Sequence, residues 1–245
     1  MNSLLSRCLA GTLPFALIMT SWLAEAAVIP VAEDVMTSSF FTGSNRVRGY
    51  AADNRPVLRV STDAPFGQVG AETLYLGFDP AAFSGLAGPV QARLTVHSVA
   101  GGFGADAGPS NPFTVSAHAL LANPFTDILD DTQPGGSVDW LTFYQQDIAP
   151  AATAASTVID GFGSYSFDVS AIVAAWLDGA NAVFAIALTG RNNSGADFLH
   201  GFLDNSVAPG SSFLTVTAVP LPGTLLSLLP GLAALALLGR RRVPA

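Results

Sequence analysis

Between residues 27 and 218 the sequence consists of short runs in which apolar and polar side chains alternate. Alternation sends successive side chains to opposite faces, as in a strand that is buried on one face. Turn-forming Gly, Pro, Asn and Asp separate the runs. The runs are 57–61, 73–78, 91–97, 113–118, 165–169, 183–188, 198–203 and 212–217. Short strands without long helices between them predict an all-β fold, a jelly-roll-like antiparallel β-sandwich.

One segment of this region has a helical rather than an alternating pattern. Ser170 precedes the apolar run 171–177, and Gly179 follows it. Serine is a favoured N-cap residue and glycine a common stop signal, so the pattern predicts one short helix that begins after Ser170. Because the run lasts about two turns, we expect the helix to pack across one end of a sheet.

The charge of residues 27–218 limits what this region can bind. The sequence has no lysine, and the region has six arginines against 17 acidic residues, which gives a formal charge of −11. Such a surface repels nucleic acids and anionic headgroups, so we exclude nucleic acid as a partner. The single cysteine, Cys8, precedes the region, which therefore has no disulfide and no thiolate metal site.

The first apolar end of the chain, residues 1–26, has the organisation of a secretory signal peptide. Arg7 precedes an apolar run at 9–23, and small residues at Ala24 and Ala26 form an A-x-A cleavage site. We therefore predict recognition by the export translocon and cleavage just after Ala26. An uncleaved N-terminal membrane anchor is the alternative.

The second apolar end comprises residues 219–245. Its run 221–238 has 18 residues without charge, and a helix of that length spans about 27 Å, close to the hydrocarbon thickness of a bilayer. The arginine cluster 240–242 follows directly and would keep this end in the cytoplasm. The pattern predicts a C-terminal transmembrane helix with the domain 27–218 outside.

The tail also has three parts in a fixed order: a Val-Pro-Leu-Pro motif, an apolar span and an arginine cluster. The residues of the motif and the cluster are Val219, Pro220, Leu221, Pro222, Arg240, Arg241 and Arg242. This order resembles the PEP-CTERM class of bacterial sorting signals in its Val-Pro-Leu-Pro-Ala form, although Gly223 replaces the alanine. The resemblance implies an exosortase-type membrane protease as partner. It also implies transient inner-membrane anchoring, cleavage near the motif, and a final place at the cell surface or with extracellular polysaccharide.

Three segments of the middle domain carry a second, weaker resemblance. They are 72–79, 90–96 and 165–170, the last followed by Val173 and Trp176. They resemble DNRLRE-type β-sandwich modules, which are related to a carbohydrate-binding module family, although 72–79 lacks the arginine at its head. The matched residues are structural. The resemblance therefore implies a fold, and no ligand-binding residue transfers with it.

The domain has no motif that points to catalysis. A Gly-x-Ser-x-Gly elbow is absent, and His97, His118 and His200 lie far apart without metal-ligand spacing. Glycosidases need two paired acids, most often Glu, and only Glu33 and Glu72 follow the predicted cleavage site. We therefore expect a protein that is not an enzyme and needs no cofactor.

Two binding sites remain open as hypotheses. Acidic residues of one loop offer oxygen ligands of the kind that calcium prefers, with a solvated loop as the alternative. These residues are Asp127, Asp130, Asp131 and Asp139. Trp140 and Tyr144 alternate onto one face and form a candidate sugar-stacking pair, with core packing as the alternative.

These features together predict an exported, non-catalytic surface or extracellular-matrix protein that is processed through its C-terminal sorting signal. A carbohydrate-binding module is the alternative function. A calcium-dependent adhesive domain is the second alternative.

Overall fold

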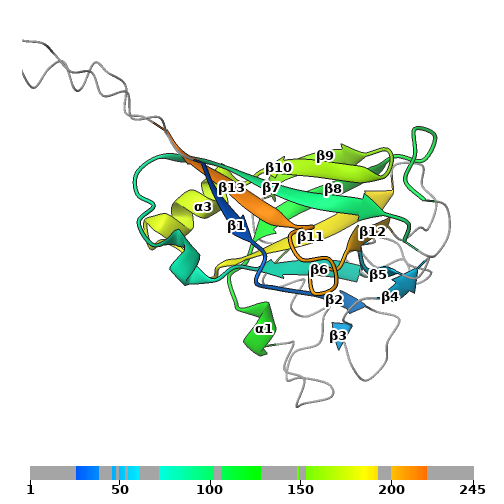
Figure 1. The fold of residues 1–245 in the computed structure, drawn as a ribbon, viewed down its shortest axis with the longest axis horizontal. Helices are drawn as coiled ribbons and strands as arrows, with labels where there is room; N and C mark the ends of the chain where they lie inside the picture. Colours follow the sequence, from blue (N-terminus) through cyan, green and yellow to red (C-terminus); the bar gives the residue numbers. More distant parts are fainter. Residues whose placement is uncertain are drawn as a thin grey trace, which may run out of the picture.

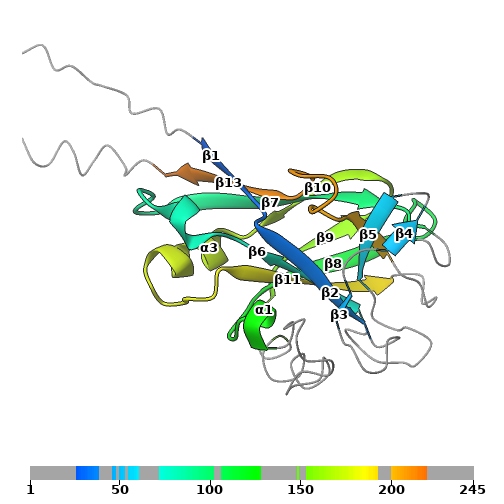
Figure 2. The same cartoon turned by 60° about the horizontal axis from the view of Figure 1, so that its bottom comes forward.

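The computed structural model describes residues 26–38, 46–47, 50–52, 55–60, 72–101, 106–127, 148, 153–192 and 200–219. Within them the chain folds as two packed β-sheets with one short helix at an end of the sandwich (Figures 1 and 2). The described strand pairings are all antiparallel. The prediction of an all-β antiparallel sandwich is confirmed.

The first sheet is organised around the long strand β7. Its described order is β1 (Ala26–Pro30), β13 (Phe213–Ala218), β7 (Val90–Val99), β12 (His200–Leu203), β5 (Arg55–Val60) and β4 (Tyr50–Ala52). Strands β13 and β12 follow each other along one edge of β7, and β10 (Gly163–Asp168) pairs with the other edge. This arrangement makes β7 the central strand of the sheet.

The second sheet lies across the core from the first. Its described order is β3 (Arg46–Val47), β2 (Glu33–Ser38), β6 (Glu72–Gly77), β11 (Ala185–Asn192), β8 (Phe113–Ala119) and β9 (Thr153–Ile159). Strand β9 belongs to this sheet and β10 to the first, so the turn between them carries the chain from one sheet to the other. The Thr157 hydroxyl donates to the Ser166 carbonyl oxygen at 2.9 Å and ties the two strands together.

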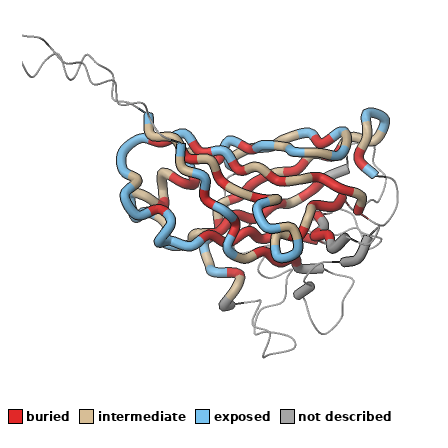
Figure 3. Tube along the Cα trace, viewed as in Figure 1, coloured by how far each residue is buried: buried red, intermediate tan, exposed pale blue. Residues whose placement is uncertain are grey.

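The main core lies between the sheets and is formed by the inward positions of the alternating runs (Figure 3). In β7, Leu94 and Val96 are fully buried, whereas the neighbouring Arg93 is exposed. Leu74 and Leu76 of β6 face them from the second sheet. A fully buried side chain of this size stabilises the fold by about 1.5–3 kcal/mol. The apolar positions of the alternating runs therefore supply the main stabilising term, which is burial of apolar surface.

Strand β6 departs from simple alternation because all six of its residues are buried. Its outward residue Tyr75 packs in a second, smaller core with Val35, Leu120, Ile148 and Ala187. The outer face of the second sheet is therefore covered at this point. Residues of β6 and β11 are therefore buried on both faces of this sheet.

The helix α3 (Ser170–Leu177) forms where it was predicted, but Ser170 does not cap it. Val169 occupies the N-cap position and makes no side-chain capping hydrogen bond, whereas Asp168 Oδ1 accepts the Ser170 N–H at 3.1 Å. The Ser170 hydroxyl instead donates to Asp168 Oδ1 at 2.6 Å and accepts from the Ala92 N–H at 3.0 Å. The capping prediction is wrong because the hydroxyl ties the helix to β7. Gly179 follows the helix with a φ of 77°, as the predicted stop requires.

The two ends of the described domain lie together at one edge of the first sheet. Strand β1 pairs with β13 so that Ala26 is opposite Thr217 and Pro30 is opposite Phe213. Figures 1 and 2 show the two strands side by side. Because Ala26 is the first residue of β1, the predicted cleavage after it leaves the other four residues of the strand in place.

No helix in the described part of the chain is long and apolar enough to cross a membrane. The predicted transmembrane run 221–238 and the signal-peptide residues 1–25 lie outside that part.

Candidate functional site

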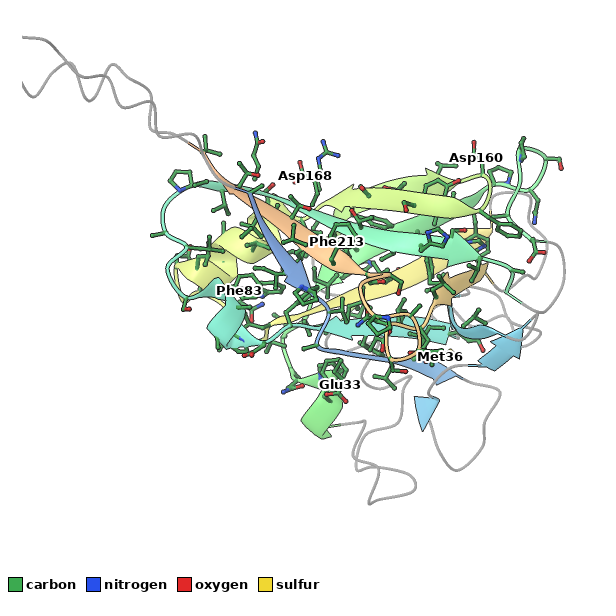
Figure 4. The ribbon with its side chains drawn as sticks, viewed as in Figure 1. Glu33, Met36, Phe83, Asp160, Asp168 and Phe213 are labelled. Atoms are coloured by element: carbon green, nitrogen blue, oxygen red, sulfur yellow. The ribbon has the colours of Figure 1, made fainter. Side chains whose placement is uncertain are left out.

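A cavity of about 410 Å³ opens where the start of β2 meets the end of β6 and the short helix α1 (Pro124–Asp127). Four separate chain segments line it: 32–33, 77–80, 123–125 and 182–185. Its polar and aromatic members are Glu33, Asp79, Asn123, Phe78, Phe125 and Phe184. Figure 4 shows Glu33 at the start of β2, beside α1. The volume falls within the range of about 300–1,000 Å³ that is typical of small-ligand sites.

The aromatic wall of the cavity depends on a glycine. A Cβ atom on Gly77 would lie 2.6 Å from Cε2 of Phe125, so the ring packs directly against the backbone at the end of β6. Just before Phe125, Asn123 Oδ1 accepts the backbone N–H of Phe125 at 2.9 Å. This local Asx turn leaves the amide nitrogen of Asn123 as the donor that the side chain presents.

The floor of the cavity is continuous with a cluster of aromatic rings. Phe184 stacks on Trp176 of α3 with ring centroids 5.3 Å apart. Trp176 also contacts Phe83 at 5.5 Å and Phe78 at 5.8 Å. Aromatic pairs in such arrangements add about 0.5–1.5 kcal/mol beyond burial. The floor is thus held in place by the helix and by the core beneath it.

The cavity has an acidic rim. Asp79 is exposed, and its Oδ1 accepts the Ala81 N–H at 2.9 Å, which starts the 3-10 helix η1 (Pro80–Phe83). Glu33 is half-buried at the first position of β2. The lining residues, all of them described, include no Arg, Lys or His. Glu33 and Asp79 are the charged side chains among these lining residues.

A second cavity of about 250 Å³ adjoins the first and shares Ala32 and Glu33 with it. Asp34 of its lining and the nearby Asp204 hold a turn of the backbone. Asp34 Oδ2 accepts the Asn205 N–H at 2.6 Å. Asp204 Oδ1 accepts the Ser206 N–H at 2.8 Å and also its hydroxyl.

The residues predicted for ligand binding fall mostly outside the described part of the chain. Trp140 and Tyr144 lie there, as do Asp130, Asp131 and Asp139, whereas Asp127 ends α1. Among the described residues, no group of three or more His, Cys, Asp or Glu side chains is placed to hold a metal ion. The calcium and sugar-stacking hypotheses for this loop remain predictions.

The structure also contains a Ser–His pair that the sequence did not reveal. The Ser98 hydroxyl donates to the Gly161 carbonyl oxygen at 2.8 Å and lies 2.8 Å from His200 Nε2. Because the Ser98 hydroxyl proton is already donated to Gly161, the Ser98 oxygen must accept from His200. A neutral His200 therefore carries its proton on Nε2, and its buried Nδ1 has no hydrogen-bond partner. Burial lowers the pKa of His200 to about 4.

This pair is structural, because a nucleophile must reach its substrate. Ser98 and His200 are 0% and 1% exposed, respectively, and the imidazole lies between Phe113 and Phe202, with ring centroids 5.5 and 5.2 Å away. His118 binds Thr189 Oγ1 elsewhere, at 2.9 Å.

The predicted sorting motif begins at the boundary of the described domain. Val219 follows β13, and its N–H donates to the Pro89 carbonyl oxygen at 2.8 Å. Pro220, Leu221, Pro222 and Arg240–Arg242 lie outside the described residues, as does Ala24.

A scan against protein-family models gives no match for this sequence, and a search of curated proteins gives none either.

Proposed function

We propose that the chain is an exported, non-catalytic protein of the cell surface or extracellular matrix that is processed through its C-terminal sorting signal. Residues 1–26 act as the signal peptide, and residues 219–245 act as a removable handle with a transmembrane helix. The domain between them has jelly-roll-like connectivity. An exosortase-type membrane protease is the processing partner.

The pairing of β1 with β13 is the observation that carries this proposal. Ala26 lies opposite Thr217, and residues opposite each other on paired antiparallel strands are about 5 Å apart. A domain that is led through a membrane by its N-terminus and held by its C-terminus must have both ends near the same bilayer. In this fold the two ends of the described domain lie side by side.

The charge of the domain agrees with such a location. With six arginines against 17 acids between residues 27 and 218, the surface is repelled by anionic headgroups once the handle is removed. After cleavage the domain is therefore released from the membrane, or transferred to a component of the matrix, rather than bound again to the membrane surface.

The proposal is tested by replacing Arg240, Arg241 and Arg242 with Gln in a bacterium that has an exosortase. We expect the variant to lose stable retention at the inner membrane and to be processed more slowly, because the stop-transfer charge is gone. Replacing Arg93, an exposed arginine of β7, with Gln is the control and should leave processing unchanged. Identical fractionation and processing of the triple variant and the unmodified chain would refute the proposal.

A further inference from the structure

We infer that β1 is the closing strand of this fold and that its docking on β13 conceals the predicted signal-cleavage bond, which joins Ala26 to Ala27. Removal of the signal peptide therefore has to precede completion of the sandwich. The inference deepens the proposed function and rests on it for the place of the cleavage bond. The docking of β1 itself requires only the folded domain.

The first argument is the position of the cleavage bond within the fold. Ala26 and Ala27 are the first two residues of β1 and lie opposite Thr217 and Val216 of β13. A protease that reads an extended segment pairs with the backbone edge of that segment, and β13 already holds one edge of β1. Cleavage therefore requires β1 to leave β13, and the cleavage rate follows the population of the undocked state.

The second argument concerns the contacts that keep β1 docked. Ile29 is 2% exposed and Val31, directly after the strand, is 3% exposed, and both belong to the main core. The Val31 N–H donates to the Ser212 carbonyl oxygen at 3.2 Å, and the Ala32 N–H donates to the Gly77 carbonyl oxygen at 2.8 Å. Because Ile29 lies so close to the cleavage bond, a protease that takes up the residues on both sides of the bond has to displace this buried side chain.

The third argument is the order in which the two strands leave the cytoplasm. In the described part of the first sheet, β1 stands at the end of the strand order, next to β13. A chain that crosses the membrane with its N-terminus first exposes β1 early, whereas β13 emerges just before the predicted transmembrane run 221–238. The cleavage bond is therefore open during most of the export and is covered when β13 arrives.

The experiment measures cleavage of the folded full-length precursor by a bacterial signal peptidase in detergent. The readout is the rate at which the new N-terminus appears, followed by mass spectrometry. Each rate is divided by the rate for a synthetic peptide of residues 1–35 that carries the same substitution. This peptide has no β13 on which to dock, so it gives the intrinsic reactivity of the bond.

Two substitutions separate docking from recognition by the peptidase. Ile29→Ala removes the buried anchor of β1 and should raise the normalised rate at least about tenfold, because the undocked state becomes more populated. Val28→Ala is the matched control. It lies closer to the bond, but its side chain is 65% exposed, so the normalised rate should stay within about twofold. Circular dichroism checks that both precursors are folded.

A reversible lock gives the opposite test and does not depend on the folding of Ile29→Ala. Val28 lies opposite Thr215, with about 4.5–5.5 Å between the Cα atoms, a separation that a disulfide spans. In a chain that carries Cys8→Ser, the pair Val28→Cys and Thr215→Cys holds β1 on β13 when it is oxidised. We expect the oxidised precursor to be cleaved at least about tenfold more slowly than the same precursor after reduction.

Two results would overturn the inference. One is a normalised rate for folded Ile29→Ala that is no higher than the rate for Val28→Ala. The other is equal cleavage of the oxidised and reduced forms of the disulfide variant. If either result is obtained while the peptide is cleaved after Ala26, only the closing-strand inference fails. If the peptide is not cleaved at all, the signal peptide of the proposed function fails, and the inference fails with it.

Discussion

Lowering the pH from 7 to 5 should destabilise the fold through His200. The pKa of this imidazole is about 4 in the folded protein, against an ordinary value of 6.5, because burial disfavours the charged form. Below pH 6.5 the unfolded chain therefore binds a proton that the folded chain does not, so the free energy of unfolding falls as the pH falls. Integrating between these two values gives a loss of about 2 kcal/mol between pH 7 and pH 5, and the loss levels off below pH 4.

The assay is urea unfolding of the full chain at pH 7 and pH 5, followed by far-UV circular dichroism. His200→Gln keeps an N–H donor for Ser98 and removes the titrating group, so its pH dependence should be shallower by about 2 kcal/mol over the same interval. Ser98→Ala is the companion variant and should retain the steep dependence because the imidazole remains buried. If His200→Gln shows the same slope as the unmodified chain, the account of a neutral buried imidazole is wrong.

Three further substitutions and one control variant test the packing and the hydrogen bonds of the fold, each measured by urea unfolding. Gly190→Ala would place a Cβ 2.7 Å from Val60 Cγ2 and should cost about 1–3 kcal/mol through overpacking, whereas Gly108→Ala meets nothing within 4 Å and should change stability little; equal costs would contradict this. Trp176→Ala should cost about 3–5 kcal/mol because it removes the centre of the aromatic cluster, and a loss below 1 kcal/mol would contradict that role. Ser170→Ala should cost about 1 kcal/mol, because it removes the hydroxyl bonds to the Ala92 N–H of β7 and to Asp168 Oδ1. An unchanged midpoint would show that the bond to β7 contributes nothing.

The alternating runs predicted the strands well because period-two burial is a local property of the sequence. Each of the eight runs overlaps a strand of the structure. In β7 the buried positions Ala92, Leu94 and Val96 are the apolar members of the predicted run. The boundaries moved by a few residues, as for 198–203, where β12 begins at His200.

Other strands have no such local signal. Strand β9 reads Thr-Ala-Ala-Ser-Thr-Val-Ile, and its alanines and serine give little strand propensity. It forms because β8 supplies a partner, including the Ser116–Ser156 hydroxyl pair at 2.8 Å. Strand β1 was missed because Ala26 and its neighbour looked like the small residues of a cleavage site.

The cavity was not predictable from the sequence because its walls come from four distant segments. Glu33 and Asp79 each look like an isolated surface acid, and only the fold brings them to one opening. The Ser98–His200 pair is separated by 102 positions, so no motif marks it. The Asn-Pro-Phe sequence at 123–125 carried the one local signal, an Asx turn before a short helix.

Export and processing of the protein are tested most directly by two measurements on the protein recovered from the cell surface and the medium. These are its intact mass and its N-terminal sequence. We predict a chain that begins at or next to Ala27 and ends near the Val219–Gly223 motif, with β1 and β13 both retained. Recovery of only the full-length chain, beginning at Met1 and ending with Arg240–Arg242 and the residues after them, would contradict it.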